Sequence, residues 1–160
     1  MPRRGAGGGS VASTVDPMST SGERVLTLEE LTEFGVSLGR ALAARGPNVV
    51  TLSGDLGTGK TTLTRAIGRG FGVVEPVTSP TFALVHEYAA RHGRRLFHLD
   101  LYRIKGPHEL ANIGWESLLE APALLIIEWP DRAGELIPPN AMAITLAHVE
   151  GDETRRLVTW

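Results

Sequence analysis

The spacing of hydrophobic residues divides the N-terminal half of the chain into helical and strand-like segments. A capping-box pattern, TLEE at residues 27–30, opens a stretch in which apolar residues recur at helical spacing until a Gly-Pro pair, so we predict a helix there. A short strand is predicted just before it, at residues 24–26. The β-branched run at 49–52 predicts a buried strand, and a second helix is predicted from residue 60 to about residue 69.

The C-terminal half contains more predicted strands than helices. Residues 123–127 form an uninterrupted apolar run, which predicts a central parallel strand. The run at 95–99 is interrupted by His98 and follows a hairpin turn, so we expect a half-exposed strand there. The other predicted elements are an extended stretch at 82–88, short helices at 107–110 and 115–119, and a terminal antiparallel hairpin at 141–147 and 155–158.

Length and composition indicate one domain behind a polar tail. The chain has 160 residues, and 13 of the first 22 are Gly, Ser, Pro or Thr. Such a segment buries too little apolar surface to offset its loss of conformational entropy, so we expect residues 1–22 to be a disordered tail. Residues 23–160 are enough for a single domain with one hydrophobic core.

Charge and cysteine content exclude several classes of protein. The chain has 16 basic and 18 acidic residues and a net charge of −2, which disfavours a strongly basic nucleic-acid binder, so no DNA partner is expected. It has no cysteine, which excludes disulfides, thiolate metal sites and cysteine nucleophiles. No apolar run approaches the ~18 residues of a membrane span and no secretory signal is found, so we expect a cytoplasmic protein with no membrane partner.

A glycine-rich turn between the strand at 49–52 and the next helix carries the chemistry. GDLGTGKT at residues 54–61 fits the pattern G-x-x-x-x-G-K-[ST], which binds nucleotide phosphates through backbone N–H groups and the positive end of a helix. Lys60, one of two lysines beside 14 arginines, would reach the β- and γ-phosphates as a compact charge. Thr61 would supply a hydroxyl to Mg²⁺. The predicted ATP-binding residues of this segment are Gly54, Asp55, Gly57, Thr58, Gly59, Lys60, Thr61 and Thr62.

A P-loop needs a second acidic group to hold Mg²⁺, usually at the end of a buried strand. Glu128 follows the continuous apolar run, and Asp100 follows the interrupted one. We assign Glu128 to Mg²⁺ and Asp100 to catalysis beside it, where Asp100 would orient the attacking water or hold a metal-bound water. Capping of the turn after its own strand is the alternative for Asp100. Together these elements predict an α/β, three-layer P-loop NTPase-like domain, with a mixed central sheet and antiparallel terminal strands.

A Thr-Ser-Pro-Thr turn lies between the P-loop and Glu128. In nucleotide switches, a Thr or Ser in this interval senses the γ-phosphate through the metal, which makes Thr78, Ser79 and Thr81 switch candidates. The same residue types are also typical of an ordinary turn. The sequence leaves these two interpretations open.

Four segments together resemble the TsaE family of bacterial P-loop ATPases. GDLGTGKTT, VTSPTFALVHEY, HLDLYR and IIEWPDR occur in this order, and the resemblance covers residues 24–160. It implies an ATPase with Mg²⁺ as cofactor, weak alone, that acts in the synthesis of tRNA threonylcarbamoyladenosine. Such a protein would reset the TsaD–TsaB complex, which modifies adenosine 37 of ANN-decoding tRNAs, and would contact tRNA through that complex.

The resemblance also implies roles for single residues. By matching, Lys60 falls on the family's phosphate-binding position, and Thr61 and Glu128 fall on its two Mg²⁺ positions. Asp100 falls on the acidic residue of the DLYR segment, and Trp129 falls on the tryptophan beside the nucleotide site. Two departures are visible. Phe82 stands where the family has a tyrosine, and HELANIG at residues 108–114 lacks the family's second acidic position.

Other P-loop functions fit less well. A small-molecule kinase needs an acceptor-binding segment, and this domain leaves little length for one, although the arginines of residues 91–95 could serve as a lid. A GTP-driven switch commonly has an N/T-K-x-D loop, which neither lysine provides, so ATP is favoured over GTP. A binding module without hydrolysis is disfavoured because the predicted metal and catalytic side chains are present. No arginine finger is evident, and Arg103 and Arg132 are the nearest candidates.

Overall fold

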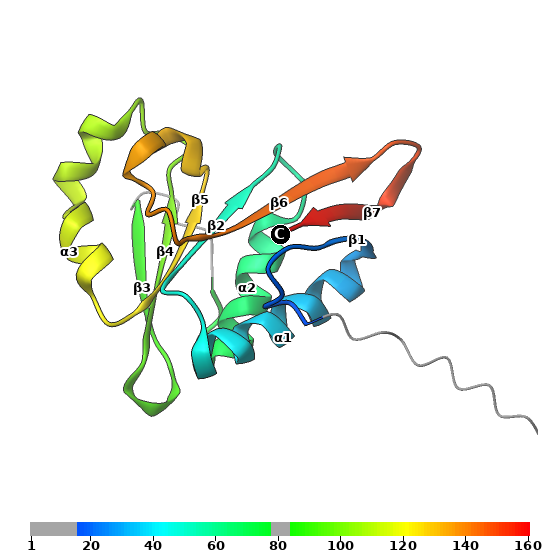
Figure 1. Ribbon diagram of the computed structural model, residues 1–160, viewed down its shortest axis with the longest axis horizontal. Coiled ribbons are helices and arrows are strands. Elements are labelled where there is room, and N and C mark those ends of the chain that lie inside the picture. Colours follow the sequence, from blue (N-terminus) through cyan, green and yellow to red (C-terminus); the bar gives the residue numbers. More distant parts are fainter. Residues whose placement is uncertain (1–15, 78–83) are drawn as a thin grey trace, which may run out of the picture.

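The computed structural model describes residues 16–77 and 84–160, and within them a seven-stranded sheet forms the centre of the molecule (Figure 1). The strands lie in the order β1-β7-β6-β2-β5-β4-β3. Their bounds are β1 Glu23–Thr27, β2 Val49–Ser53, β3 Val85–Ala89, β4 Arg95–Asp100, β5 Leu124–Glu128, β6 Met142–Val149 and β7 Asp152–Thr159.

The sheet is mixed, with a parallel centre and antiparallel edges. Strands β6, β2, β5 and β4 pair in parallel, whereas β7, β1 and β3 pair antiparallel with their neighbours. The predicted α/β architecture with antiparallel terminal strands is confirmed. The predicted terminal hairpin is the pair β6–β7.

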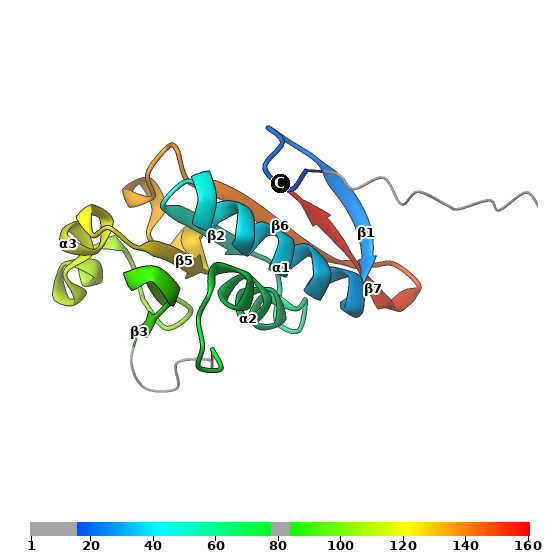
Figure 2. The same ribbon diagram turned by 90° about the horizontal axis from the view of Figure 1, so that it is seen from below.

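Helices cover both faces of the sheet, which gives three layers (Figure 2). One face packs against α1 (Leu28–Arg45) and α2 (Lys60–Phe71), and the other against α3 (Trp115–Glu120) and the 3-10 helix Pro107–Ile113. The further 3-10 helices are Arg91–Gly93, Pro130–Arg132 and Gly134–Leu136. No helix within the described residues is long and apolar enough to cross a membrane.

The predicted capping box starts α1. The Thr27 hydroxyl accepts the backbone N–H of Glu30 at 3.1 Å, and the Glu30 carboxylate accepts the N–H of Thr27 at 3.1 Å. The hydrogen bond from the Thr27 backbone N–H favours the ionised carboxylate and lowers the pKa of Glu30. The helix ends where predicted, because Gly46, whose N–H makes the last helical hydrogen bond to Leu42 O, adopts an extended backbone with φ −78° and ψ 166°.

The prediction of a half-exposed strand at 95–99 is wrong. Strand β4 is buried from Leu96 to Leu99, because β5 pairs with one of its edges, β3 pairs with the other, and helices cover both faces. His98, which suggested exposure, has an exposed fraction of 0%. The hairpin itself is confirmed, since β3 and β4 are antiparallel neighbours joined through Arg91–Gly93.

Part of the expected N-terminal tail contacts the domain. Gly22 and Trp160 exchange two backbone hydrogen bonds, at 2.8 and 2.9 Å, and Met18 packs against the core. Pro17 is buried as well. Contacts of the domain therefore begin before Glu23, and disorder at the start of the chain stays a prediction.

Candidate nucleotide site

The P-loop connects the end of β2 to the start of α2. Its backbone requires glycine at three points, because Gly54 has φ 152°, Gly57 has φ 77° and Gly59 has φ 102°. A Cβ on Gly54 would lie 2.4 Å from the carbonyl oxygen of Leu146 in β6. The loop therefore rests directly on the neighbouring strand, and α2 starts at Lys60 as predicted.

Lys60 is folded back onto the loop. Its ammonium donates hydrogen bonds to the carbonyl oxygens of Gly54 and Asp55, the latter at 2.9 Å, and lies 4.5 Å from the centre of the Trp129 ring. Burial lowers the pKa of Lys60, while the negative charges of Glu128, Asp100 and Asp55 act in the opposite direction. The ammonium is thus held where the loop closes, beside two strand-end carboxylates.

Glu128 ends β5 as a buried carboxylate, with an exposed fraction of 3%. Its Oε1 lies 3.2 Å from the hydroxyl of Thr64 on α2, which also lies 2.9 Å from Lys60 O, so one hydroxyl proton is shared by two acceptors. Its Oε2 lies 3.6 Å from Nε2 of His98. Neither ring nitrogen of His98 has a hydrogen-bond partner among the described residues. Glu128 is therefore held from α2 by the Thr64 hydroxyl, and β4 places His98 beside it.

Asp100 lies beside Glu128, because the register of β4 and β5 pairs these two residues. Its Oδ1 accepts the N–H of Tyr102 at 3.0 Å. This bond is the turn cap that the sequence offered as the alternative role. Since the same side chain also lines an open cavity beside the P-loop, which is described below, the structure is compatible with both roles.

Trp129 follows Glu128 in a left-handed backbone conformation, with φ 58° and ψ 53°. Such a conformation is uncommon outside glycine and persists only where the surroundings hold it. Its ring packs on Tyr102 at a centroid distance of 5.0 Å and on the Lys60 ammonium. The strained turn thus aims the ring at the P-loop.

One open cavity of about 330 Å³ brings most of the predicted site together. The predicted residues that line it are Gly57, Gly59, Lys60, Thr61, Thr62, Asp100, Glu128 and Trp129. Three predicted ATP-binding residues, Gly54, Asp55 and Thr58, are not part of the lining among the described residues. Thr58 is 1% exposed and its hydroxyl donates to Asp55 O at 2.8 Å, so it closes the turn from within.

Sequence reasoning missed three residues of the cavity wall, namely Leu28, Leu56 and Arg156. Arg156 is 8% exposed and donates to Thr58 O and Gly57 O. A signal for it exists in the sequence. The alternation of β7 places Arg156 in phase with Val158 and Trp160, both of which are buried in the core.

The donor set at this site suits Mg²⁺. The Thr61 hydroxyl and the Glu128 carboxylate are hard oxygen donors, and Mg²⁺ typically binds one or two protein carboxylates together with phosphate oxygens and waters. No cluster of three or more His, Asp or Glu side chains within residues 16–77 and 84–160 could hold a metal by itself.

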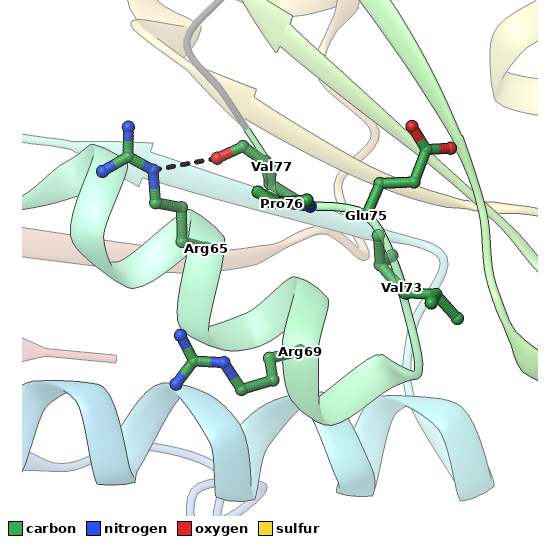
Figure 3. Close-up of a pocket in the computed structure, with 7 residues that line it drawn as sticks. Arg65, Arg69, Val73, Glu75, Pro76 and Val77 are labelled. Atoms are coloured by element: carbon green, nitrogen blue, oxygen red, sulfur yellow. Dashed lines mark hydrogen bonds between the residues drawn. The ribbon is translucent and has the colours of Figure 1, made fainter.

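The switch candidates Thr78, Ser79 and Thr81, and Phe82, lie outside the described residues. A second cavity lies between α2 and the segment that follows it (Figure 3). Arg65 and Arg69 line it together with the segment from Val73 to Val77, and Arg65 Nε donates to Val77 O at 2.8 Å. In the described part of the chain it shares no lining residue with the nucleotide cavity.

Comparisons with known proteins point to one family. The family model described as "Threonylcarbamoyl adenosine biosynthesis protein TsaE" matches residues 25–157. A tRNA threonylcarbamoyladenosine biosynthesis protein TsaE from Nostoc sp. is 42% identical over 109 residues, which are 65% of this chain and 64% of that protein. The protein of the same description from Haemophilus influenzae is 34% identical over 110 residues, 69% of each chain.

A solved structure shares the fold. The crystal structure of Bacillus subtilis YdiB matches with a TM-score of 0.62 and 27% identity, over 87% of this chain and 83% of that chain. The match to the Nostoc protein spans just under two thirds of that relative's length. With the family model covering the P-loop and both strand-end carboxylates, the chain belongs to the TsaE family.

Proposed function

We propose that the chain hydrolyses ATP with Mg²⁺ and thereby supports tRNA threonylcarbamoyladenosine synthesis, by resetting a TsaD–TsaB complex between turnovers. The carrying observation is the convergence of the P-loop lysine, the Thr61 hydroxyl and two strand-end carboxylates in one cavity. The names of the family and its relatives support the process. Contact with tRNA through the complex, and a cytoplasmic location, belong to the same proposal.

The chain's own residues divide the work of binding. The N–H groups of the loop and the first turn of α2 hold the phosphates. Lys60 exchanges the carbonyls of Gly54 and Asp55 for phosphate oxygens, and Trp129 flanks the nucleotide. When bound, Mg²⁺ would be held by Thr61 and Glu128 and would neutralise charge that develops on the phosphates.

Asp100 is assigned to the attacking water. Its Oδ1 is used by the Tyr102 amide, which fixes the carboxylate at the strand end and leaves Oδ2 for the water. Glu128 is held by Thr64 and approached by His98, so its position suits a fixed metal ligand. The assignment gives the two neighbouring carboxylates different roles.

The two roles are separable by substitution. Glu128→Ala is expected to weaken the dependence of nucleotide binding on Mg²⁺, because it removes a metal ligand. Asp100→Ala is expected to spare binding and to reduce hydrolysis, because only the water is affected. Magnesium titrations of both variants with a non-hydrolysable ATP analogue measure the first effect, and phosphate release measures the second. Loss of the Mg²⁺ response in Asp100→Ala alone would reverse the two assignments.

The isolated chain is expected to hydrolyse ATP slowly. Among the described residues that line the cavity, the arginine is Arg156. Its guanidinium N–H groups donate to backbone carbonyls and are not directed toward a phosphate. A positioned arginine can contribute a factor of about 10³–10⁵ to phosphoryl transfer. A partner that completes the site would therefore raise turnover. We assign Thr78, Ser79 and Thr81 to the segment that senses the γ-phosphate for that partner.

A multiple-turnover threonylcarbamoylation assay tests the function. With TsaD–TsaB and tRNA present, modified tRNA is expected to accumulate past one turnover with the wild-type chain, but not with Lys60→Ala or without the chain. ATP hydrolysis is expected to rise when TsaD–TsaB is added. Equal yields in all three reactions would contradict the function and favour a small-molecule kinase.

A further inference from the structure

Arg156 lies in β7 at a position where the alternation of the strand places side chains toward the core. It is 8% exposed, pairs with Leu26 of β1 and His148 of β6, and precedes the buried Val158 by two residues. A buried charge is costly unless it is paired or fully hydrogen-bonded. Among the described residues no carboxylate lies within 4.0 Å of its guanidinium. Its partners are all backbone carbonyls.

The guanidinium bridges β7 and the P-loop. On the strand side, Nη1 donates to the carbonyl oxygens of Glu153 and Arg155, both at 2.8 Å. On the loop side, Nε donates to Thr58 O at 3.2 Å and Nη2 donates to Gly57 O at 3.3 Å. All three guanidinium nitrogens are used, and the planar group is anchored at one end while it holds two successive peptide units at the other.

Holding a carbonyl also fixes the next amide. In a trans peptide the C=O and the following N–H point in opposite directions across one plane. The bond to Thr58 O therefore turns the Gly59 N–H to the opposite side of the loop. The bond to Gly57 O does the same for the Thr58 N–H, which donates to Asp55 O at 3.3 Å and closes the turn.

The loop needs such a restraint because glycines flank these peptides. Gly57 has φ 77°, with nothing within 4 Å of where a Cβ would be, and Gly59 has φ 102°. Glycine adopts several backbone conformations at little cost, so either peptide could rotate. Rotation of the Thr58–Gly59 peptide would present a carbonyl oxygen where a phosphate has to bind, which replaces attraction by repulsion, and rotation of the Gly57–Thr58 peptide would break the turn to Asp55 O.

We propose that Arg156 is a positioning residue that orients the Thr58–Gly59 peptide for phosphate binding and holds the Gly57–Thr58 peptide in the turn that supports it. It acts through these peptides and not by touching the nucleotide. Its charge, placed at the carbonyl end of the Thr58–Gly59 peptide, also polarises that peptide toward the anion. This role rests on the proposed function in so far as the bound anion is a nucleotide phosphate.

The chain offers a matched control for the test. Arg155 is the adjacent residue of β7, is exposed, and pairs with Asp152 at 3.5 Å. Arg155→Met removes the same charge from the opposite face of the strand. Arg156→Met removes the donors and keeps most of the stem, whereas Arg156→Lys keeps the charge but has one nitrogen, which cannot span four carbonyls.

Two measurements decide the role. Calorimetry with ADP is expected to show about a ten- to hundredfold loss of affinity for Arg156→Met, a smaller loss for Arg156→Lys, and no change for Arg155→Met. Amide NMR spectra of the nucleotide-free proteins are expected to show shifted or broadened signals for Gly57, Thr58 and Gly59 in both Arg156 variants. A merely structural role would lower stability without this localised signature.

The possible outcomes separate the two proposals. If the wild-type chain did not bind ADP, the proposed function would fail, and the amide spectra would still report on the peptides. If Arg156→Lys bound ADP as tightly as wild type with unchanged loop amides, the positioning role would be overturned. That variant keeps the charge in the core, so it decides the question even if Arg156→Met does not fold.

Discussion

Lys60→Ala is expected to lower the affinity for ATP by about ten- to a hundredfold, because charge-assisted hydrogen bonds contribute about 1.5–3 kcal/mol each. The ammonium bonds to the loop carbonyls and is influenced by the negative charges of Glu128 and Asp100, and in the proposed function a bound phosphate meets it there. The fold is expected to survive. Lys60 is buried, but its hydrogen bonds go to carbonyls of the loop that borders the open cavity, so water can replace it.

Lys105→Ala is the matched control for that experiment. It is the chain's other lysine, and it lies in an exposed segment after β4. Calorimetry should give wild-type affinity for this variant. Lys60→Arg keeps the charge but replaces a compact ammonium by a planar group, so it is not expected to restore binding. Wild-type ATP affinity in Lys60→Ala would remove Lys60 from the site.

The features that the sequence predicts best depend on residues that are close together in the chain. The capping box needs only Thr27 and Glu30, three positions apart, and both of its hydrogen bonds form. The turn from β2 into α2 is likewise specified within eight residues, through glycines that accept positive φ. Such local patterns constrain the backbone directly, whatever the rest of the chain does.

His98 shows where the hydrophobic pattern misleads. A polar residue in an apolar run usually indicates a solvent-facing position, which is why β4 was expected to be half-exposed. In the structure β4 is an inner strand, and His98 is fully buried with Nε2 near the Glu128 carboxylate. Its place depends on the parallel register that sets Asp100 opposite Glu128, and that pairing joins residues far apart in sequence.

Arg156 shows a different limit. The alternation of buried and exposed residues in β7 predicts that Arg156 faces the core. The burial of its charge is explained only when the carbonyl groups that accept its hydrogen bonds are known. Two of these carbonyl groups belong to the P-loop, nearly one hundred residues earlier in the chain. The sequence therefore locates the phosphate loop, whereas only the fold reveals which strand supports it.

The hydrophobic pattern of the sequence also did not predict the close contact between α1 and α2. Such a pattern is made by apolar side chains, whereas this contact depends on glycines, which have none. A Cβ on Gly39 would lie 2.1 Å from the carbonyl oxygen of Ile67 and 2.7 Å from the amide nitrogen of Phe71. A Cβ on Gly70 would lie 2.0 Å from Val36 O. The two helices thus meet backbone to backbone, and α1 supports the helix that begins with Lys60.

Gly39→Ala is therefore expected to lower the free energy of unfolding by about 1–3 kcal/mol, since overpacking a tight contact has a cost of this size. Helix propensity alone predicts the opposite sign, a gain of about 1 kcal/mol for alanine over glycine. Packing should prevail because the obstacle is main chain, which no side-chain rotation can move away. The helices have to separate instead, and the displaced α2 is expected to weaken ADP binding as well.

Urea unfolding of Gly39→Ala beside Ser37→Ala measures this balance. Ser37 lies on the exposed side of the same helix, so its substitution reports propensity without the packing contact and is expected to be neutral or slightly stabilising. If Gly39→Ala unfolded at the same or a higher urea concentration than wild type, propensity would outweigh packing. The close approach of α1 and α2 would then not be what holds the P-loop helix in place.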